Sequence, residues 1–311
     1  MTFEQAEQIM REIGRINISQ SSAWRIVNRW GGKMQAIEAL QITEFFENNE
    51  IGNSISNQTS ERMGTSMDGT MIHIREEGWK ELKVGCVFGI EQNSQYDPRI
   101  QNETEICSTI HNSYVAHLGG PTIFGRKLCT EAHQRHWSKA KETVVLGDGA
   151  TWIWNLTNEH FYKSYQLVDW FHAAEHLSNA TKVLFGEDTP TAKRLYNQWE
   201  TKLYLGRIDD LVKSMKSHIK KYPRKAEAVL KEASYFQKNS KRMNYQEMRN
   251  EGYPIGSGMV ESAGKQYKAR FCGAGMHWSR DGAENLLPIR TAILSNRFDY
   301  IWSQIYNSPL N

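Results

Sequence analysis

The sequence predicts an α/β fold with a mixed β-sheet, joined to a long helical region. Between residues 60 and 170, apolar and β-branched segments with the composition of strands occur in the order three strands, a helix, a strand, a helix and a strand. From 171 to 250, apolar residues recur at helical spacing instead. Because adjacent strands can pair antiparallel and strands joined by a helix pair parallel, one sheet with both strand directions is expected.

Residues 1–46 are predicted to be helical. Apolar residues recur at helical spacing up to Ile13, and after a polar turn Ser19 is placed to cap a second helix that runs to about Trp30. Two arginines lie four positions apart in this second helix, Arg25 and Arg29. The outline is that of a helix-turn-helix, whose second helix enters the DNA major groove, and it is also that of two packed helices without DNA contacts.

A polar segment over 47–62 is predicted to link this region to the sheet. Residues 60–170 form the first part of the α/β core, 171–250 a helical insertion with buried apolar stripes, and 251–311 the C-terminal helices of the core. Strands are expected at 70–74, 82–90, 106–118, 143–146 and 165–168, with helices over 122–140 and 283–302.

Composition excludes several classes of protein. The 311-residue chain has no apolar run near the ~18 residues that a membrane span needs. Its N-terminus lacks the basic and apolar regions of a secretory signal. The cysteines are far apart and form no C-x-x-C pair, which argues against a disulfide scaffold and a cysteine zinc site and indicates a reducing cytoplasm. They are Cys86, Cys107, Cys129 and Cys272.

The charge is distributed unevenly along the chain. The whole sequence has a formal net charge of only +3, but residues 211–242 contain ten basic and two acidic side chains. Such a stretch is either a solvated helical surface or a surface that binds phosphates, because neutralising phosphates releases counterions. The basic residues expected to contact DNA here are Lys220, Lys221, Arg224 and Lys225.

Three acidic residues occupy settings that suit metal binding. Asp68 is expected at the start of the first strand pair, Asp148 follows an apolar strand between two glycines, and Glu261 follows a Gly-Ser-Gly break on a helix. Each alone is typical of a turn or a helix surface. Together, two strand-borne aspartates and a helix-borne glutamate can hold two Mg²⁺ or Mn²⁺ ions ~4 Å apart, with positions left for water and phosphate.

Four motifs, in this order, resemble the bacterial DDE transposases of the ISKra-type insertion sequences, which are related to the Mutator and hAT group. They are Met67-Asp-Gly-Thr, Leu146-Gly-Asp-Gly-Ala, Val168-Asp-Trp-Phe-His-Ala-Ala-Glu-His-Leu and Gly256-Ser-Gly-Met-Val-Glu-Ser. The resemblance covers roughly residues 60–300. It implies an RNase H-like fold with a large all-helical insertion before the glutamate helix, and it implies that Asp68, Asp148 and Glu261 are the catalytic metal ligands.

The resemblance also implies partners and an activity. The family cuts double-stranded DNA at the terminal inverted repeats of its element and joins it to target DNA, in a reaction that depends on Mg²⁺. Pairing two DNA ends implies a homodimer or a higher oligomer, and the bacterial setting implies a cytoplasmic, nucleoid-associated protein without membrane contacts. The family often carries a longer N-terminal region, so a truncated or catalytically inactive DNA-binding derivative is a second hypothesis.

The related group shares a Cys/Asp-x-x-His signature, which Asp169-Trp-Phe-His172 matches. The resemblance implies that Asp169, Trp170 and His172 shape the active site and help to hold DNA near the cut. Physically, His172 can contact a phosphate and Trp170 can stack on an unpaired base; the alternative is that both are core residues. On the glutamate helix, the basic residues expected to face DNA phosphates are Lys265, Lys268 and Arg270.

The same segment spells a competing motif. His172-Ala-Ala-Glu175-His176 is an H-x-x-E-H pattern, in which two histidines one helical turn apart bind zinc and the glutamate acts as the base of a metalloprotease. A third ligand would come from elsewhere, such as Glu247 or Glu251. This interpretation gives no role to the three acidic residues above or to the basic stretch.

Overall fold

One mixed five-stranded sheet lies at the centre of the protein. The computed structural model describes residues 1–48, 60–97 and 102–306. The strands are β1 (Arg62–Ile74), β2 (Gly78–Asp97), β3 (Asn102–Leu118), β4 (Glu142–Gly147) and β5 (Tyr165–Val168). They lie in the order β3-β2-β1-β4-β5. β1 pairs antiparallel with β2 and β2 with β3, whereas β4 pairs parallel with both β1 and β5, so the predicted α/β class is confirmed.

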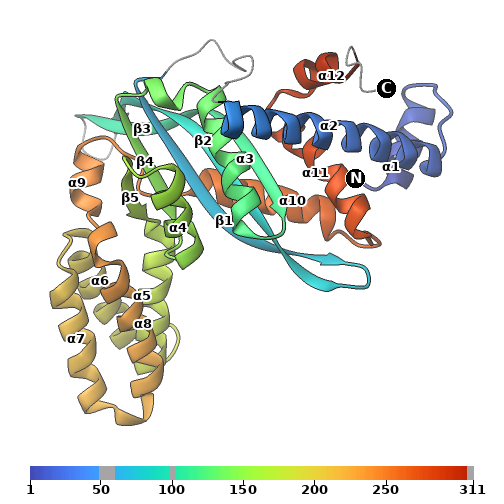
Figure 1. Cartoon of the computed structure of the whole chain (residues 1–311). Helices are drawn as coiled ribbons and strands as arrows, with labels where there is room; N and C mark the ends of the chain where they lie inside the picture. The colour runs from blue at the N-terminus through green and yellow to red at the C-terminus, as the bar shows by residue number, and fades with distance from the viewer. Residues whose placement is uncertain (49–59, 98–101, 307–311) are drawn as a thin grey trace.

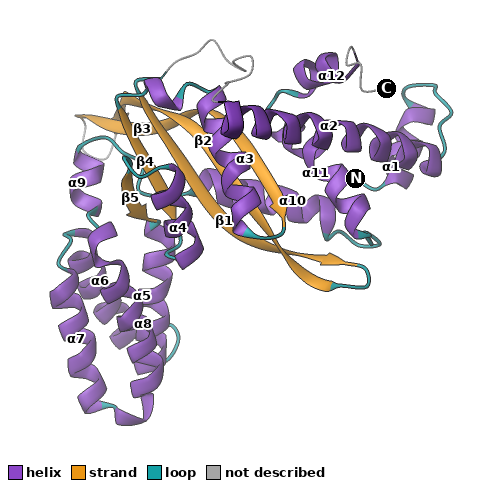
Figure 2. Cartoon of the chain, viewed as in Figure 1, coloured by secondary structure: helices purple, strands orange, loops and turns teal. Residues whose placement is uncertain are grey.

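Helices surround the sheet and form a separate arm beside it (Figure 2). The helices are α1 (Phe3–Glu12), α2 (Gln20–Asn48), α3 (Pro121–Gln134), α4 (Thr151–His160), α5 (Trp170–Phe185), α6 (Pro190–Tyr204), α7 (Ile208–Lys221), α8 (Ala226–Asn239), α9 (Tyr245–Asn250), α10 (Gly258–Phe271), α11 (Arg280–Leu294) and α12 (Phe298–Tyr306). The predicted order of three strands, helix, strand, helix and strand is therefore correct.

Both faces of the sheet are covered. On one face lies α3, and a Cβ atom added at Gly85 of β2 would be 2.8 Å from Leu128 of that helix. On the other face α10 lies against β1 (Figure 1). Glu261 of α10 and Asp68 of β1 line the same pocket. Side chains from the strands and from both helix layers, such as the fully buried Val145, form one continuous apolar core.

Helices α5 to α8 extend away from the sheet as an arm (Figure 1). Successive helices pack together, and α8 returns along α5. The apolar stripes predicted from the sequence are buried in this arm, including Leu195, Trp199, Leu211 and Met215, which confirms that they are core. The junction of α7 and α8 lies at the end of the arm farthest from the sheet.

The second N-terminal helix is longer than predicted. α2 runs to Asn48 instead of ending near Trp30, because Gly31 and Gly32 do not interrupt it. A Cβ atom added at Gly31 would lie only 1.7 Å from the backbone oxygen of Asn285, so the glycine lets α2 cross α11 closely. The short second helix of the predicted helix-turn-helix outline is thus the first part of a long helix packed on the C-terminal region.

The structure also bears on the predicted limits of the first strand, the C-terminal helix and the linker. β1 begins at Arg62 rather than at 70, because its first half pairs with β4 as well as β2, and Asp68 therefore lies within the strand. The helix predicted over 283–302 is divided into α11 and α12 by a turn in which Asn296 has a left-handed backbone, with φ 52°. Most of the linker predicted over 47–62 lies outside the described residues.

The cysteines are free thiols, with Cys86 and Cys129 buried and Cys272 exposed. Burial raises the pKa of the Cys129 thiol to about 12, so this thiol stays protonated at neutral pH. Across the described ranges, none of the helices is long and apolar enough to span a membrane.

Candidate functional site

Three aspartates occupy equivalent positions on three neighbouring strands. One row of paired residues runs across the parallel strands β1, β4 and β5, and it consists of Met67, Gly147 and Val168. The next residue on each strand is an aspartate, namely Asp68, Asp148 and Asp169. Paired residues of a parallel ladder lie side by side and point to the same face. The register therefore gathers the three carboxylates at one end of the sheet.

A fourth carboxylate reaches this end from α10. Glu261 lies in the first turn of α10, which packs against β1. Asp68, His172 and Glu261 line one pocket of about 330 Å³. Asp148 does not line this pocket, but its charge and that of Glu261 both act on Asp68, so the three carboxylates predicted from the sequence influence one another.

Burial and neighbouring charges both act on the titratable groups of the site. Burial raises the pKa of Asp68, and repulsion from Asp148 and Glu261 acts in the same direction, against the N–H of Gly69 and the charge of His172. The hydrogen bond to Asp169 raises the pKa of His172 to about 9, although burial of the ring opposes the rise. At neutral pH the imidazole is therefore a cation among carboxylates.

Asp169 positions other groups and is fully buried. Its Oδ1 accepts the backbone N–H of His172 at 2.8 Å and lies 3.1 Å from Nδ1 of the same residue. Its Oδ2 accepts the backbone N–H of Ser257, the residue that precedes α10. Burial acts to raise the pKa of Asp169, but these hydrogen bonds hold it below the ordinary value. Because Asp169 is buried, it acts on its surroundings through His172 and Ser257, and its expected part in holding DNA stays a prediction.

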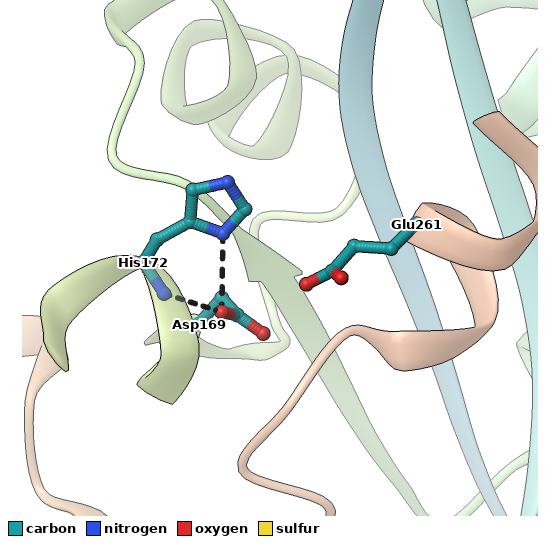
Figure 3. Close-up of side chains that lie close together, drawn as sticks. All are labelled: Asp169, His172 and Glu261. Carbon is teal, nitrogen blue, oxygen red and sulfur yellow. Dashed lines mark hydrogen bonds and ion pairs between the residues drawn. The ribbon is translucent and has the colours of Figure 1, made fainter. Parts of the chain in front are cut away.

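One compact group could hold a metal ion. Ligand atoms of Asp169, His172 and Glu261 all lie within 4.8 Å of one another (Figure 3). Among the described residues, Asp68 and Asp148 do not join them in so tight a group. The protonated ring of His172 is a poor partner for a cation, whereas Asp68, Asp148 and Glu261 offer the hard oxygens that Mg²⁺ prefers.

The loop that carries Asp148 is held by the arm. The hydroxyl of Tyr235, on α8, donates to the backbone carbonyl of Asp148 at 2.8 Å. Gly149 has a left-handed backbone with φ 99°, and a Cβ atom there would lie 2.7 Å from the ring of Tyr235. Lys238 donates to Thr151 at 2.8 Å just beyond the loop. Sequence analysis missed Tyr235, because nothing in the local sequence of α8 indicates which strand end it contacts.

Of the two aromatic residues that follow Asp169, the structure exposes the one that sequence analysis did not select. Trp170 packs edge-to-face against Tyr204 and Tyr245, with ring centroids 5.9 and 4.9 Å apart. This favours the interpretation of Trp170 as a core residue and not as a platform for a base. Its neighbour Phe171 is 61% exposed and lines the pocket.

The basic residues of α10 divide into two groups. Lys265 and Lys268 line the pocket one and two turns after Glu261, as their spacing predicts. Arg270 points elsewhere: its guanidinium lies 5.3 Å from the Phe3 ring and 4.8 Å from the Trp278 ring. The prediction that Arg270 contacts DNA at the site is therefore not supported by its position.

The other basic residues expected to contact DNA lie outside the pocket. Arg25 and Arg29 are exposed on α2, where Arg25 donates to Ser22 at 3.0 Å and Arg29 lies over the Trp30 ring. Four more are exposed around the junction of α7 and α8, and they are Lys220, Lys221, Arg224 and Lys225. Of these, Lys225 donates to the carbonyl of Leu184 at 2.7 Å. None of these six lines the pocket at the sheet.

The H-x-x-E-H motif does not form a zinc site in the described part of the chain. His176 contacts other residues of the arm: its Nδ1 lies 2.5 Å from the Glu232 carboxylate, and its ring stacks on Tyr235. His172 instead pairs with Asp169, so the two histidines serve different partners. The potential ligand group contains His172 but neither His176 nor the suggested third ligands Glu247 and Glu251.

Comparison of the chain with protein-family models finds no match, and comparison with curated proteins finds none either.

Proposed function

We propose that the protein is a Mg²⁺-dependent DNA transposase with an RNase H-like core, which cuts DNA at the ends of its element and joins a freed 3′-hydroxyl to target DNA. One observation carries the proposal. The carboxylates of Asp68 and Asp148 follow the same row of β1 and β4, and α10 adds Glu261 at the same end of the sheet. The strand order and directions are those expected of an RNase H-like fold.

Asp68, Asp148 and Glu261 would hold two divalent ions, Mg²⁺ or Mn²⁺. When bound, such ions activate a water or hydroxyl nucleophile and stabilise the leaving oxygen of a phosphodiester. The protein's own groups then supply positioning. Asp169 orients His172 and keeps it cationic, which suits it to donate to a phosphate oxygen. Tyr235 fixes the backbone of the Asp148 loop.

DNA binding would involve two surfaces. Lys265 and Lys268 face the pocket and would bind phosphates next to the cut. The exposed basic cluster at the end of the arm, formed by Lys220, Lys221 and Arg224, would contact the duplex farther away. Pairing of two DNA ends would require at least two copies of the chain.

An excision assay tests the proposal. The donor plasmid carries a resistance marker between the two DNA segments that flank the gene for this protein. The protein itself is supplied from a second plasmid. We expect excision by the wild type and its loss in Asp148→Asn and Glu261→Gln, whereas Asp299→Asn, an exposed matched replacement on α12, retains it. Excision by the Asp148→Asn variant would refute the assignment. DNA binding without excision by the wild type would favour a non-catalytic derivative.

A further inference from the structure

Phe171 is an exposed aromatic residue in a pocket of charged groups. Its side chain is 61% exposed, and it lines the pocket together with Asp68, Glu261 and Lys265. It lies in the first turn of α5, next to the hydrogen-bonded cap formed by Asp169. Single exposed apolar side chains are common, but this one lies in the pocket beside the candidate metal ligands, where it is available to a bound strand.

The Phe171 ring is held by a contact with the backbone next to it. A Cβ atom added at Gly256 would lie 2.8 Å from Cε2 of Phe171, so the ring rests on the glycine backbone. Since Gly256 belongs to the segment tied to Asp169 through Ser257, both sides of this contact are anchored. The ring is therefore a preformed surface and not a loose side chain.

Gly264 leaves unfilled space on the opposite wall. It lies in the interior of α10, where glycine is less favourable than alanine. A Cβ atom added at Gly264 would meet no heavy atom within 4 Å, and the backbone is not left-handed. Neither packing nor conformation therefore requires glycine here. The space that its missing side chain leaves opens into the pocket that Phe171 lines.

We propose that Phe171 and Gly264 form a subsite for one unpaired nucleobase of the DNA strand held at the site. A base offers a flat face to the phenyl ring, and Lys265 and Lys268 are placed for the phosphates on either side of it. A base inside a duplex is covered by its neighbours, so only an unpaired base can stack in this way. The pocket of about 330 Å³ is large enough for one nucleobase. The inference rests on the proposed function.

Metal-free DNA binding tests the subsite separately from cleavage. The probes are two duplex oligonucleotides of the same sequence, one with a 2-aminopurine paired with thymine and one with the same base opposite an abasic site. We expect the wild type to prefer the second probe and to quench its fluorescence by stacking. Phe171→Ala should reduce that preference by about tenfold, the effect of losing one stacked base, and Phe171→Tyr should restore it.

Matched variants separate the subsite from general effects. Gly264→Ala should fold normally yet lose the preference, because the methyl group occupies the subsite. Gly258→Ala should keep it: a Cβ atom there also meets no neighbour within 4 Å, but Gly258 does not line the pocket. Tyr162→Ala, which removes a 68% exposed ring elsewhere, should also keep it.

The outcomes are distinguishable. Equal binding of both probes by the wild type, or an unchanged preference in Phe171→Ala, would overturn the subsite even if excision is confirmed. Absence of any DNA binding would overturn the proposed function and the subsite with it. A preference that depends on Phe171 in a protein that does not excise would leave the subsite standing and refute the catalytic assignment alone.

Discussion

Buried or half-buried charged side chains gather in two places in this protein, and the two groups differ in how their charges are paired. Beneath α3, the carboxylate of Glu131 lies 2.6 Å from the guanidinium of Arg297. Burial acts to raise the pKa of Glu131, but Arg297, Ser113 and Arg135 together hold it below the ordinary value. Arg135 itself donates to Ser113 at 3.0 Å and to the carbonyl of Val87. We call this group the matched cluster, because its carboxylate has an ion-pair partner in Arg297.

The carboxylates of Asp68, Asp148 and Glu261 are not matched in this way. In the part of the chain that the structure describes, neither Asp68, Asp148 nor Glu261 forms an ion pair, and the imidazolium of His172 is already bound to Asp169. Asp68 is instead repelled by the charges of Asp148 and Glu261. A group of charges that stabilises a fold is expected to be paired, whereas unpaired like charges destabilise it and are typical of functional sites. The comparison therefore separates a structural cluster from the proposed cation-binding site.

The largest effect is expected in the matched cluster. Glu131→Gln should lower the free energy of unfolding by about 3–5 kcal/mol, because it leaves the mostly buried Arg297 without its carboxylate and removes the negative charge beside the buried Arg135. Urea unfolding measures this. The exposed ion pair of Lys141 and Glu61 is the control, and Glu61→Gln should cost less than about 1 kcal/mol. A Glu131→Gln protein as stable as the wild type would show that the cluster is not structural.

The pH dependence of the same variant has a defined sign. Because folding lowers the pKa of Glu131, its contribution to stability is present above the unfolded value, about 4.3, and is lost as the pH falls through the lower folded value. The difference in stability between the wild type and Glu131→Gln should thus shrink as the pH falls below about 4. A difference that stays constant from pH 7 to strongly acidic solution would contradict this account.

A smaller effect is expected where the arm meets the site. Tyr235→Phe removes one hydrogen bond to the carbonyl of Asp148 and should cost about 1 kcal/mol. We expect about a five- to tenfold higher Mn²⁺ concentration for half-maximal excision, since the Asp148 loop is then less well positioned. Tyr196→Phe, which removes a hydroxyl bonded to Glu200 on α6, is the matched control. An unchanged Mn²⁺ requirement would limit Tyr235 to a structural role.

The smallest effect has the opposite sign. Asp68→Asn should raise the free energy of unfolding of the metal-free protein by up to about 1 kcal/mol, because it removes a charge repelled by Asp148 and Glu261. The same variant should lose excision. Thermal unfolding in a chelator measures the stability. A clear loss of stability would mean that Asp68 belongs with the matched charges and not with the unpaired ones.

Much of the sheet could be predicted from the sequence. β4 and β5 are short apolar runs bounded by turns, and their predicted limits are within one residue of those observed. Two helix limits could not be predicted, because they depend on distant packing. Gly31 resembles a helix end until its close approach to Asn285 is known. The turn at Asn296 falls within a pattern of apolar residues that continues through α11 and α12.

The site was predictable in part. Glycines and strand ends indicated Asp68, Asp148 and Glu261, and the register now explains why two of them meet. The choice between Trp170 and Phe171 could not be made from the sequence, since the phase of α5 after its cap decides which ring is buried. The role of Tyr235 could not be predicted from the sequence either, because it arises from a contact between residues 87 positions apart.

Metal-dependent thermal unfolding tests the central claim most directly, namely that divalent ions neutralise the unpaired carboxylates of Asp68, Asp148 and Glu261. At Mn²⁺ or Mg²⁺ concentrations far above the dissociation constant, the wild type should gain about 2–4 kcal/mol in unfolding free energy and unfold at a higher temperature. Asp148→Asn should lose most of this gain, whereas Asp299→Asn should keep it. An unfolding temperature that the metal does not change in the wild type, or an equal rise in Asp148→Asn, would contradict the account.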